Sequence, residues 1–283
     1  MKAIALSWIP SFALAVPVAA QTGNLDASES LRCALAGAAE CDEAAPDPAR
    51  DAPARLLPSV PVAKATRSGL APGSDGNVRC FWCAGDLLYE AYHDDEWGFP
   101  VRDDVRLFEK ICLEGFQAGL SWITVLRKRE AFRRAFHGFD PERVARMNAR
   151  TIERLLCDPG IIRHKGKLES AVNNARRTLE LVEARGSLAT HLWEFEPGAR
   201  ERPRRITWPA LGKLTETPAS RALSKDLRQR GFSFVGPTTL YAMMQSVGLV
   251  NDHLEGCPVR ERAARARTRF RVPHPTGGAS RAG

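Results

Sequence analysis

Apolar residues recur at helical spacing from about residue 78 onward. The pattern predicts a helix over residues 104–113, and Ser121 is suited to cap another that runs through Phe136. Shorter helices are expected at residues 141–147 and 151–157. Strand-like alternation never persists for more than a few residues, so the pattern predicts an all-α domain.

A long amphipathic helix is predicted for Lys165–Arg185, where Gly186 ends it. Residues 187–195 form a further short helix in this interpretation. Residues 197–216 are rich in proline and arginine and are expected to be a connection without regular structure.

Two more helices are predicted to flank a short turn with the sequence FSFVG. Thr217 caps the first, which Gly231 ends, and Pro237 opens the second. The N–H groups at the start of a helix form a phosphate site that grips DNA without reading its sequence. An ordinary helical hairpin is the commoner structure for this pattern alone. The residues assigned to backbone contact are Gly231, Phe234, Gly236 and Thr238.

The first 77 residues differ in composition from the rest of the chain. Residues 1–20 join a lysine to an apolar run that ends in small residues, as a secretory signal does, although Pro10 and Pro17 disfavour a membrane helix. We interpret this segment as a mis-assigned start or an extension of a cytoplasmic protein. Residues 22–77 are expected to be disordered. The folded domain is then 78–260, and the arginine-rich residues 261–283 are a disordered tail.

Composition is that of a soluble globular protein, with 44% hydrophobic and 26% charged residues. The formal net charge of +8 favours an anionic partner, nucleic acid before a membrane surface. A solvated basic surface is the alternative on charge alone. The seven scattered cysteines do not form a disulfide framework, which indicates a reducing compartment.

Four residues near the two ends of the domain have the composition of a closed zinc site. Cys80 and His93 lie at its start, and His253 and Cys257 lie at its end with a spacing of four. Cys83 is an alternative ligand to Cys80, because the two are three residues apart. Buried cysteines and surface histidines would also explain the pattern.

A single acid is accompanied by a concentration of aromatic residues. Glu114 lies in a stretch that continues through two glycines to Trp122. Aromatic residues usually belong to the core, but the segment around Tyr92 is too polar for that alone. Aromatic faces beside a carboxylate suit a flipped and positively charged nucleobase. The other aromatic residues of this cluster are Trp82, Tyr89 and Trp97.

Long runs of this chain resemble the bacterial DNA-3-methyladenine glycosylase I family. They are RCFWC, YEAYHDDEWGFPV, LFEKICLEGFQAGLSWITVLRKRE, FDPERVARM, GIIRHKGKLESAVNNA and ALSKDLRQRGFSFVGPTTLYAMMQSVGLVNDH. The resemblance covers about residues 78–257. It implies a helix-hairpin-helix glycosylase fold with the hairpin at residues 231–236, and excision of 3-methyladenine from double-stranded DNA to leave an abasic site.

The resemblance also assigns residues. It implies one structural zinc ion held by Cys80, His93, His253 and Cys257, and it gives Cys83 no ligand role. It implies a base pocket of Tyr92, Glu114 and Trp122, lined by Trp82, Tyr89 and Trp97. We take Glu114 as the catalytic residue, which acts either by recognising the base or as a general base. We interpret Asp252 as structural and expect a monomer without membrane contact. The alternatives are a DNA-binding protein of this fold that has lost excision and, less favoured, a zinc hydrolase.

Overall fold

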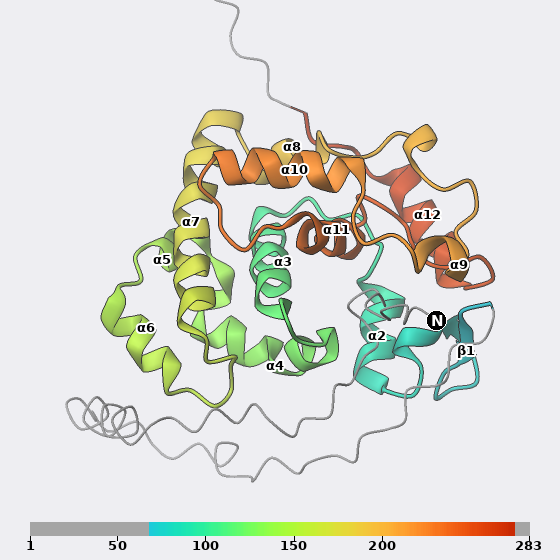
Figure 1. Ribbon diagram of the computed structural model, residues 1–283, viewed down its shortest axis with the longest axis horizontal. Coiled ribbons are helices and arrows are strands. Elements are labelled where there is room, and N and C mark those ends of the chain that lie inside the picture. Colours follow the sequence, from blue (N-terminus) through green and yellow to red (C-terminus); the bar gives the residue numbers. More distant parts are fainter. Residues whose placement is uncertain (1–67, 275–283) are drawn as a thin grey trace, which may run out of the picture.

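The computed structural model describes residues 68–274, and most of the regular structure in this range is helical (Figure 1). A two-stranded sheet and a short 3-10 helix precede the main helices. The elements are β1 (Leu70–Pro72), β2 (Val78–Cys80), η1 (Phe81–Cys83), α2 (Leu87–Asp95), α3 (Asp104–Gln117), α4 (Trp122–Ala135), η2 (His137–Phe139), α5 (Pro141–Ala145), α6 (Ala149–Leu156), α7 (Lys165–Arg185), α8 (Leu188–Trp193), η3 (Ala199–Glu201), α9 (Trp208–Leu211), α10 (Pro218–Gln229), α11 (Pro237–Ser246) and α12 (Val259–Arg269).

Helix α3 lies at the centre of the fold and contacts α4, α7, α8 and α11 (Figure 1). The Asp103 side chain caps its start by accepting a hydrogen bond from the backbone N–H of Arg106 at 2.9 Å. Its apolar side chains are buried on several sides, because neighbouring helices surround it. Each such side chain contributes about 1.5–3 kcal/mol when fully buried. The buried apolar residues of α3 are Leu107, Phe108, Ile111, Cys112, Leu113 and Phe116.

A series of stacked phenylalanine rings fixes α4 against α3. Phe116 stacks on Phe132 with ring centroids 4.4 Å apart, and Phe136 lies 5.7 Å from Phe116. Phe136 in turn stacks on Phe139 at 5.6 Å. Aromatic pairs of this kind contribute about 0.5–1.5 kcal/mol beyond their buried area. This series of phenylalanine rings therefore sets the relative positions of α3, which carries Glu114, and α4, which carries Trp122.

The helices predicted from periodicity are confirmed, with small changes at their ends. Helix α7 has the predicted bounds, and Gly186 ends it with a positive φ of 85°. Helix α3 continues past residue 113 to Gln117, so Glu114 lies on a helix. Helix α2 was not predicted, although Asp86 caps it by accepting from the Tyr89 N–H. The connection at residues 197–216 also contains η3 and α9, which the sequence pattern did not indicate.

The predicted domain limits were too narrow at both ends. Strand β1 precedes residue 78 and pairs antiparallel with β2, with Leu70 opposite Cys80. At the other end α12 extends to Arg269, because its Ala263 is fully buried and Arg267 pairs with both carboxylate oxygens of Glu196. The signal-like segment and most of the segment expected to be disordered lie outside the described residues.

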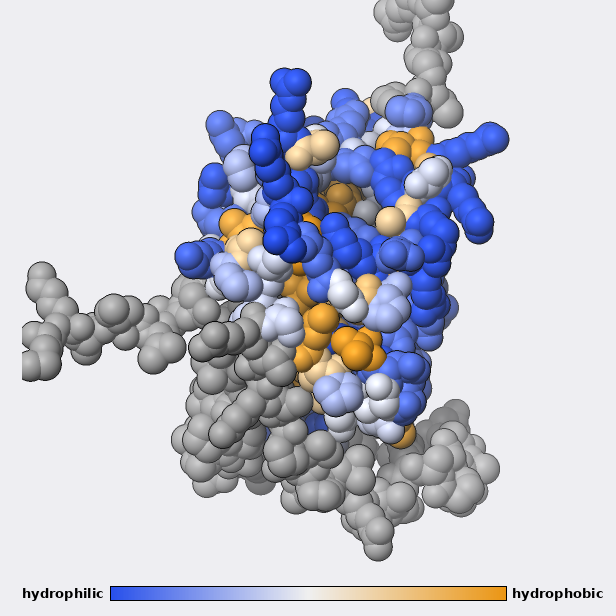
Figure 2. Space-filling model, turned by 90° about the vertical axis from the view of Figure 1, so that its right-hand side faces the viewer, coloured by the Kyte–Doolittle hydropathy of each residue, from blue (hydrophilic) through white to orange (hydrophobic). Residues whose placement is uncertain are grey.

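The face to the right of Figure 1 is largely hydrophilic, with a band of hydrophobic residues between the charged ones (Figure 2). Within residues 68–274 no helix combines the length and apolar character that crossing a membrane requires. Most of the buried apolar residues of the described region belong to one core cluster.

Candidate active site

Glu114 is a buried carboxyl group with unused hydrogen-bonding capacity. Glu114 is 4% exposed, and its Oε2 atom has no hydrogen-bond partner among residues 68–274. Burial raises the pKa of Glu114 to about 8, against the lowering influence of the Lys110 ammonium and the Ser246 hydroxyl. A buried polar atom without a partner is rare in folded proteins, which makes this oxygen a candidate for ligand contact.

Tyr92 and Trp122 bring two aromatic rings together. Tyr92 comes from α2 and Trp122 from α4, and their ring centroids are 5.3 Å apart with a tilt of 43°. Both residues are at most 2% exposed. Burial, and then the Glu114 charge, raise the pKa of Tyr92. The Trp122 Nε1 also has no hydrogen-bond partner among the described residues.

Lys110 is part of the same site, although the sequence interpretation did not include it. Its Nζ lies 4.5 Å from the centroid of the Tyr92 ring and 5.6 Å from that of Trp122. The nearest carboxylate oxygen is Glu96 Oε2, at 3.6 Å. Burial lowers the pKa of Lys110 to about 8, against the raising influence of Glu96. Its position four residues before Glu114 was the available signal, since residues at that spacing share a helix face.

The three other predicted aromatic residues form a second cluster, which contacts the rings of His93 and His253. Trp82 lies 4.9 Å from Tyr89 and 5.0 Å from Trp97, measured between ring centroids. Trp97 packs edge-on against His253, with ring centroids 4.8 Å apart. It therefore lies next to the group of cysteine and histidine residues. The Tyr89 hydroxyl is buried without a hydrogen-bond partner in the described part of the chain, and the pKa of Tyr89 is raised by burial and by neighbours that include Glu114.

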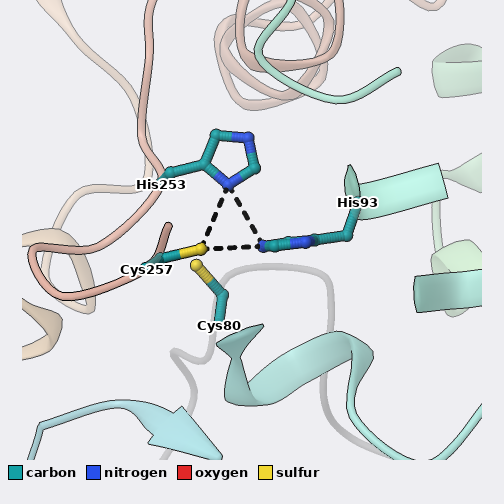
Figure 3. Close-up of side chains that lie close together, drawn as sticks. All are labelled: Cys80, His93, His253 and Cys257. Carbon is teal, nitrogen blue, oxygen red and sulfur yellow. Dashed lines mark hydrogen bonds between the residues drawn. The ribbon is translucent and has the colours of Figure 1, made fainter. Parts of the chain in front are cut away.

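Cys80, His93, His253 and Cys257 converge on one point (Figure 3). Their ligand atoms all lie within 4.8 Å of one another, and all four residues are buried. His93 Nε2 is 3.1 Å from His253 Nδ1, and Cys257 Sγ is 3.6 Å from the former and 3.9 Å from the latter. A tetrahedral zinc site separates two nitrogens by about 3.3 Å and a nitrogen and sulfur by about 3.6 Å. The donor set and its spacing therefore fit a zinc ion.

Hydrogen bonds on the outer side orient both imidazole rings. His93 Nδ1 lies 2.7 Å from Asp94 Oδ1, and His253 Nε2 lies 2.8 Å from the Trp97 carbonyl oxygen. With these nitrogens protonated, His93 Nε2 and His253 Nδ1 are free to face a metal. Gly98 permits the close approach, since a Cβ at this position would lie 3.0 Å from His253 Cδ2.

Cys83 and Asp252 have structural partners. The Cys83 thiol donates to the Cys80 carbonyl oxygen at 3.1 Å, and Cys83 is not one of the four residues that converge in the described part of the chain. The Asp252 carboxylate accepts from the Tyr241 hydroxyl at 2.6 Å, from Gln245 Nε2 at 2.9 Å and from Arg202. These donors favour the structural interpretation of Asp252.

The turn between α10 and α11 is held from α7. Asn174 both donates to the carbonyl oxygen and accepts from the N–H of Ser233, each at 2.9 Å. Gly231 has a positive φ of 84°, and Phe234 adopts 55° although it is not a glycine. Phe234 is 38% exposed. The four residues assigned to DNA backbone contact thus lie on or directly beside a fixed turn, and Gly236 caps the start of α11.

Comparison with known proteins places this architecture in a class. The family described as methyladenine glycosylase matches residues 82–261. This match covers more than half of the chain, and the chain belongs to the methyladenine glycosylase family.

Individual relatives of this chain are named as DNA-3-methyladenine glycosylases. DNA-3-methyladenine glycosylase 1 of Escherichia coli is 51% identical over 180 residues, which cover 63% of this chain and 95% of that protein. The DNA-3-methyladenine glycosylase of Haemophilus influenzae is 48% identical over 184 residues, covering 65% and 98%.

Solved structures agree with these relatives. A crystal structure of 3-methyladenine DNA glycosylase I is 51% identical, has a TM-score of 0.59 and matches over 64% of this chain and 98% of its own. A variant of such an enzyme in complex with 3-methyladenine is 40% identical, has the same TM-score and matches over 62% and 94%.

Proposed function

We propose that this protein is a DNA glycosylase that removes 3-methyladenine from alkylated double-stranded DNA. It hydrolyses the N-glycosidic bond, releases the free base and leaves an abasic site in base-excision repair. The observation that carries this proposal is the buried Glu114 carboxyl group, whose Oε2 has no partner among residues 68–274. It lies one helical turn from Lys110, whose ammonium lies over the rings of Tyr92 and Trp122. Relatives covered over nearly their whole length are DNA-3-methyladenine glycosylases, which supports the same substrate.

The residues of the site suit a flipped cationic base. An adenine methylated at N3 in DNA carries a positive charge, and aromatic faces attract such a ring by cation–π interaction. The Glu114 carboxylate would accept a hydrogen bond from the base edge and stabilise its charge. The buried Trp122 Nε1, which has no hydrogen-bond partner among residues 68–274, is a second group available to the base. The rings of Tyr92 and Trp122 are in contact, so a base could stack between them only after they separate.

The positive charge of the base weakens the bond between C1′ of the sugar and N9 before the protein acts. When this bond breaks, both electrons pass to the base, which leaves as a neutral molecule. Water adds its oxygen to C1′ and releases a proton to the solvent. The protein therefore has no need of a strong acid for the leaving group, and its contribution is to extrude the nucleotide, hold the ring and exclude bulk water.

The α10–α11 turn is the proposed grip on the DNA backbone, as in a helix-hairpin-helix. The N–H groups at the start of α11 and the α-helix dipole attract phosphate. Lys225 and Arg228 are exposed on α10 and line the same shallow hollow as Pro237 at the start of α11. Contacts of this kind position the duplex without specifying a base sequence.

A structural zinc ion is proposed for the cysteine and histidine group. Four protein ligands would close its coordination sphere, so the ion would stabilise the fold and leave no open position for substrate. Through Cys80 and His93 it would hold β2 and α2, and through His253 and Cys257 the segment before α12. Tyr92 is the neighbour of His93 on α2, so this clamp would also support the base site.

The direct test is release of free 3-methyladenine from methylated duplex DNA. The full chain is expected to release the base faster than the spontaneous rate and to leave alkali-labile abasic sites. Binding of the same DNA without release above that rate would instead support the alternative, a DNA-binding protein of this fold that has lost excision.

A further inference from the structure

Lys110 is a buried charged group that the proposed reaction does not use. Its side chain is 4% exposed, and its Nζ has no hydrogen-bond partner within residues 68–274. The ammonium lies over the Tyr92 ring and 3.6 Å from Glu96. Burying an ammonium is unfavourable unless hydrogen bonds or opposite charges compensate for its loss of hydration. Its position beside the base site indicates a role in that site.

Glu96 does not account for this charge, because other cations already surround it. Arg129 Nη1 donates to Glu96 Oε2 at 2.7 Å, and Arg106 Nη2 lies 4.0 Å from the same oxygen. Although burial acts to raise it, the pKa of Glu96 is lowered by Lys110 and Arg129. The Lys110 charge is therefore not matched by Glu96 alone, and the carboxyl groups of Glu114 and Glu109 on α3 also act on it.

Lys110 and Glu114 are four residues apart on α3 and so lie on the same face of that helix. Burial raises the pKa of Glu114, and the Lys110 ammonium is the main influence that opposes the rise. The other polar or charged groups that bear on the pair come from helices α2, α3, α4 and α11 and the segment after α2: Tyr89, Tyr92, Glu109, Arg129, Ser246 and Glu96.

We propose that Lys110 is a positioning residue for base excision, whose ammonium favours the carboxylate form of Glu114, with which a cationic base pairs. This inference rests on the proposed function. Lys110 acts through Glu114 and contacts no reacting atom. Without the ammonium, the buried Glu114 keeps its proton to a higher pH and loses the charge that attracts the base.

The test is the pH dependence of single-turnover excision from methylated DNA, from about pH 6 to about pH 10. The wild-type rate is expected to rise with pH and reach a plateau. In Lys110→Met the ascending limb is expected to shift upward by about one to two pH units. The rate near pH 7 then falls by about ten- to a hundredfold, while the limiting rate obtained by fitting the profile stays within about twofold of wild type. Lys213→Met, which removes an exposed lysine, should reproduce the wild-type profile.

A second comparison separates the proposal from a structural role for Lys110. In a Glu114→Gln background, Lys110→Met should cause no further change in the pH profile, because the group through which it acts is gone. A Lys110→Met protein that is slower by the same factor at every pH, or a limb that does not move, would overturn the inference. Wild-type protein that releases no base at any pH would contradict the proposed function itself.

Discussion

His93 Nε2 lies 3.1 Å from His253 Nδ1, although 160 positions separate the two residues in the sequence. The contact joins α2 to the segment that precedes α12. Closing so long a loop has an entropic cost, which increases slowly with loop length. A metal ion bound by these nitrogens and by Cys80 and Cys257 would offset that cost in one place.

Cys257→Ser is therefore expected to reduce zinc content and stability together. Loss of a ligand present at about a thousandfold its Kd lowers the free energy of unfolding by about 4 kcal/mol. Zinc per protein, measured by elemental analysis, and urea unfolding of the same preparation check this. A chelator should destabilise the wild-type protein in the same direction.

Cys83→Ser is the matched control, since Cys83 is equally buried and close to the group but directs its thiol to the Cys80 carbonyl oxygen. It should retain one zinc ion per protein, whereas Cys80→Ser should lose it. The reverse result would move the ligand role from Cys80 to Cys83. A stable Cys257→Ser protein that contains no metal would contradict the clamp.

Glu114→Gln is expected to slow 3-methyladenine release by about a hundredfold or more, because the amide cannot provide a negative charge for the cationic base. The substitution preserves size, so the fold should be retained, as circular dichroism would show. Glu130→Gln, on the exposed surface of α4, is the control and should excise at the wild-type rate. Full activity of the Glu114 variant would remove this residue from the mechanism.

Glu114 should also make stability depend on pH. Its folded-state pKa is raised by burial from 4.5 to about 8, so between these values the folded protein holds a proton that the unfolded chain has lost. Stability therefore falls as pH rises through this window, relative to Glu114→Gln. Lys110 has the opposite effect on stability, because its pKa is lowered from 10.5 to about 8. That effect falls between about pH 8 and pH 10.5, above the window of Glu114.

The difference in unfolding free energy between the two proteins, measured with urea at several pH values, isolates this effect. Between about pH 5 and about pH 7.5, we expect the unfolding free energy of Glu114→Gln to rise relative to that of the wild type by up to about 3 kcal/mol. A difference that is constant over this range would mean that Glu114 titrates with an ordinary pKa in the folded protein.

Local patterns in the sequence were sufficient for most of the helices. The bounds of α7 follow from its apolar face and from Gly186, whose positive φ ends the helix. Helix α2 was missed because its sequence around His93 is polar. Its burial depends on partners such as His253 and Trp122, which come from distant parts of the chain.

The difference between local patterns and long-range contacts also applies to the site. The convergence of Cys80, His93, His253 and Cys257, which the sequence suggested from composition and from the family resemblance, is confirmed as geometry. Lys110 could not be recognised as buried from the sequence, because its burial and its charge environment depend on Glu96 and on the rings that cover it. Periodicity places a residue on a helix face, but only tertiary contacts decide whether a charge on that face is solvated.

The α10–α11 turn leads to a prediction about DNA affinity. Lys225 and Arg228 are exposed beside the start of α11, where a phosphate would lie. Replacing both with glutamine should weaken binding to duplexes of any sequence and lower the slope of log K against log salt by about 1.8. Fluorescence anisotropy at several salt concentrations would measure this change, and thermal stability should be unaffected.

The charge-matched comparison is Lys213→Gln, which removes a cation from the exposed segment after α9. If affinity depended only on the total basic charge of the protein, this variant would lower the slope as much as Lys225→Gln alone. A direct phosphate contact instead releases condensed counterions at the place where it forms, so only the substitutions beside α11 should change the slope by about 0.9 each. Equal slopes for all of these variants would place the DNA backbone elsewhere on the surface.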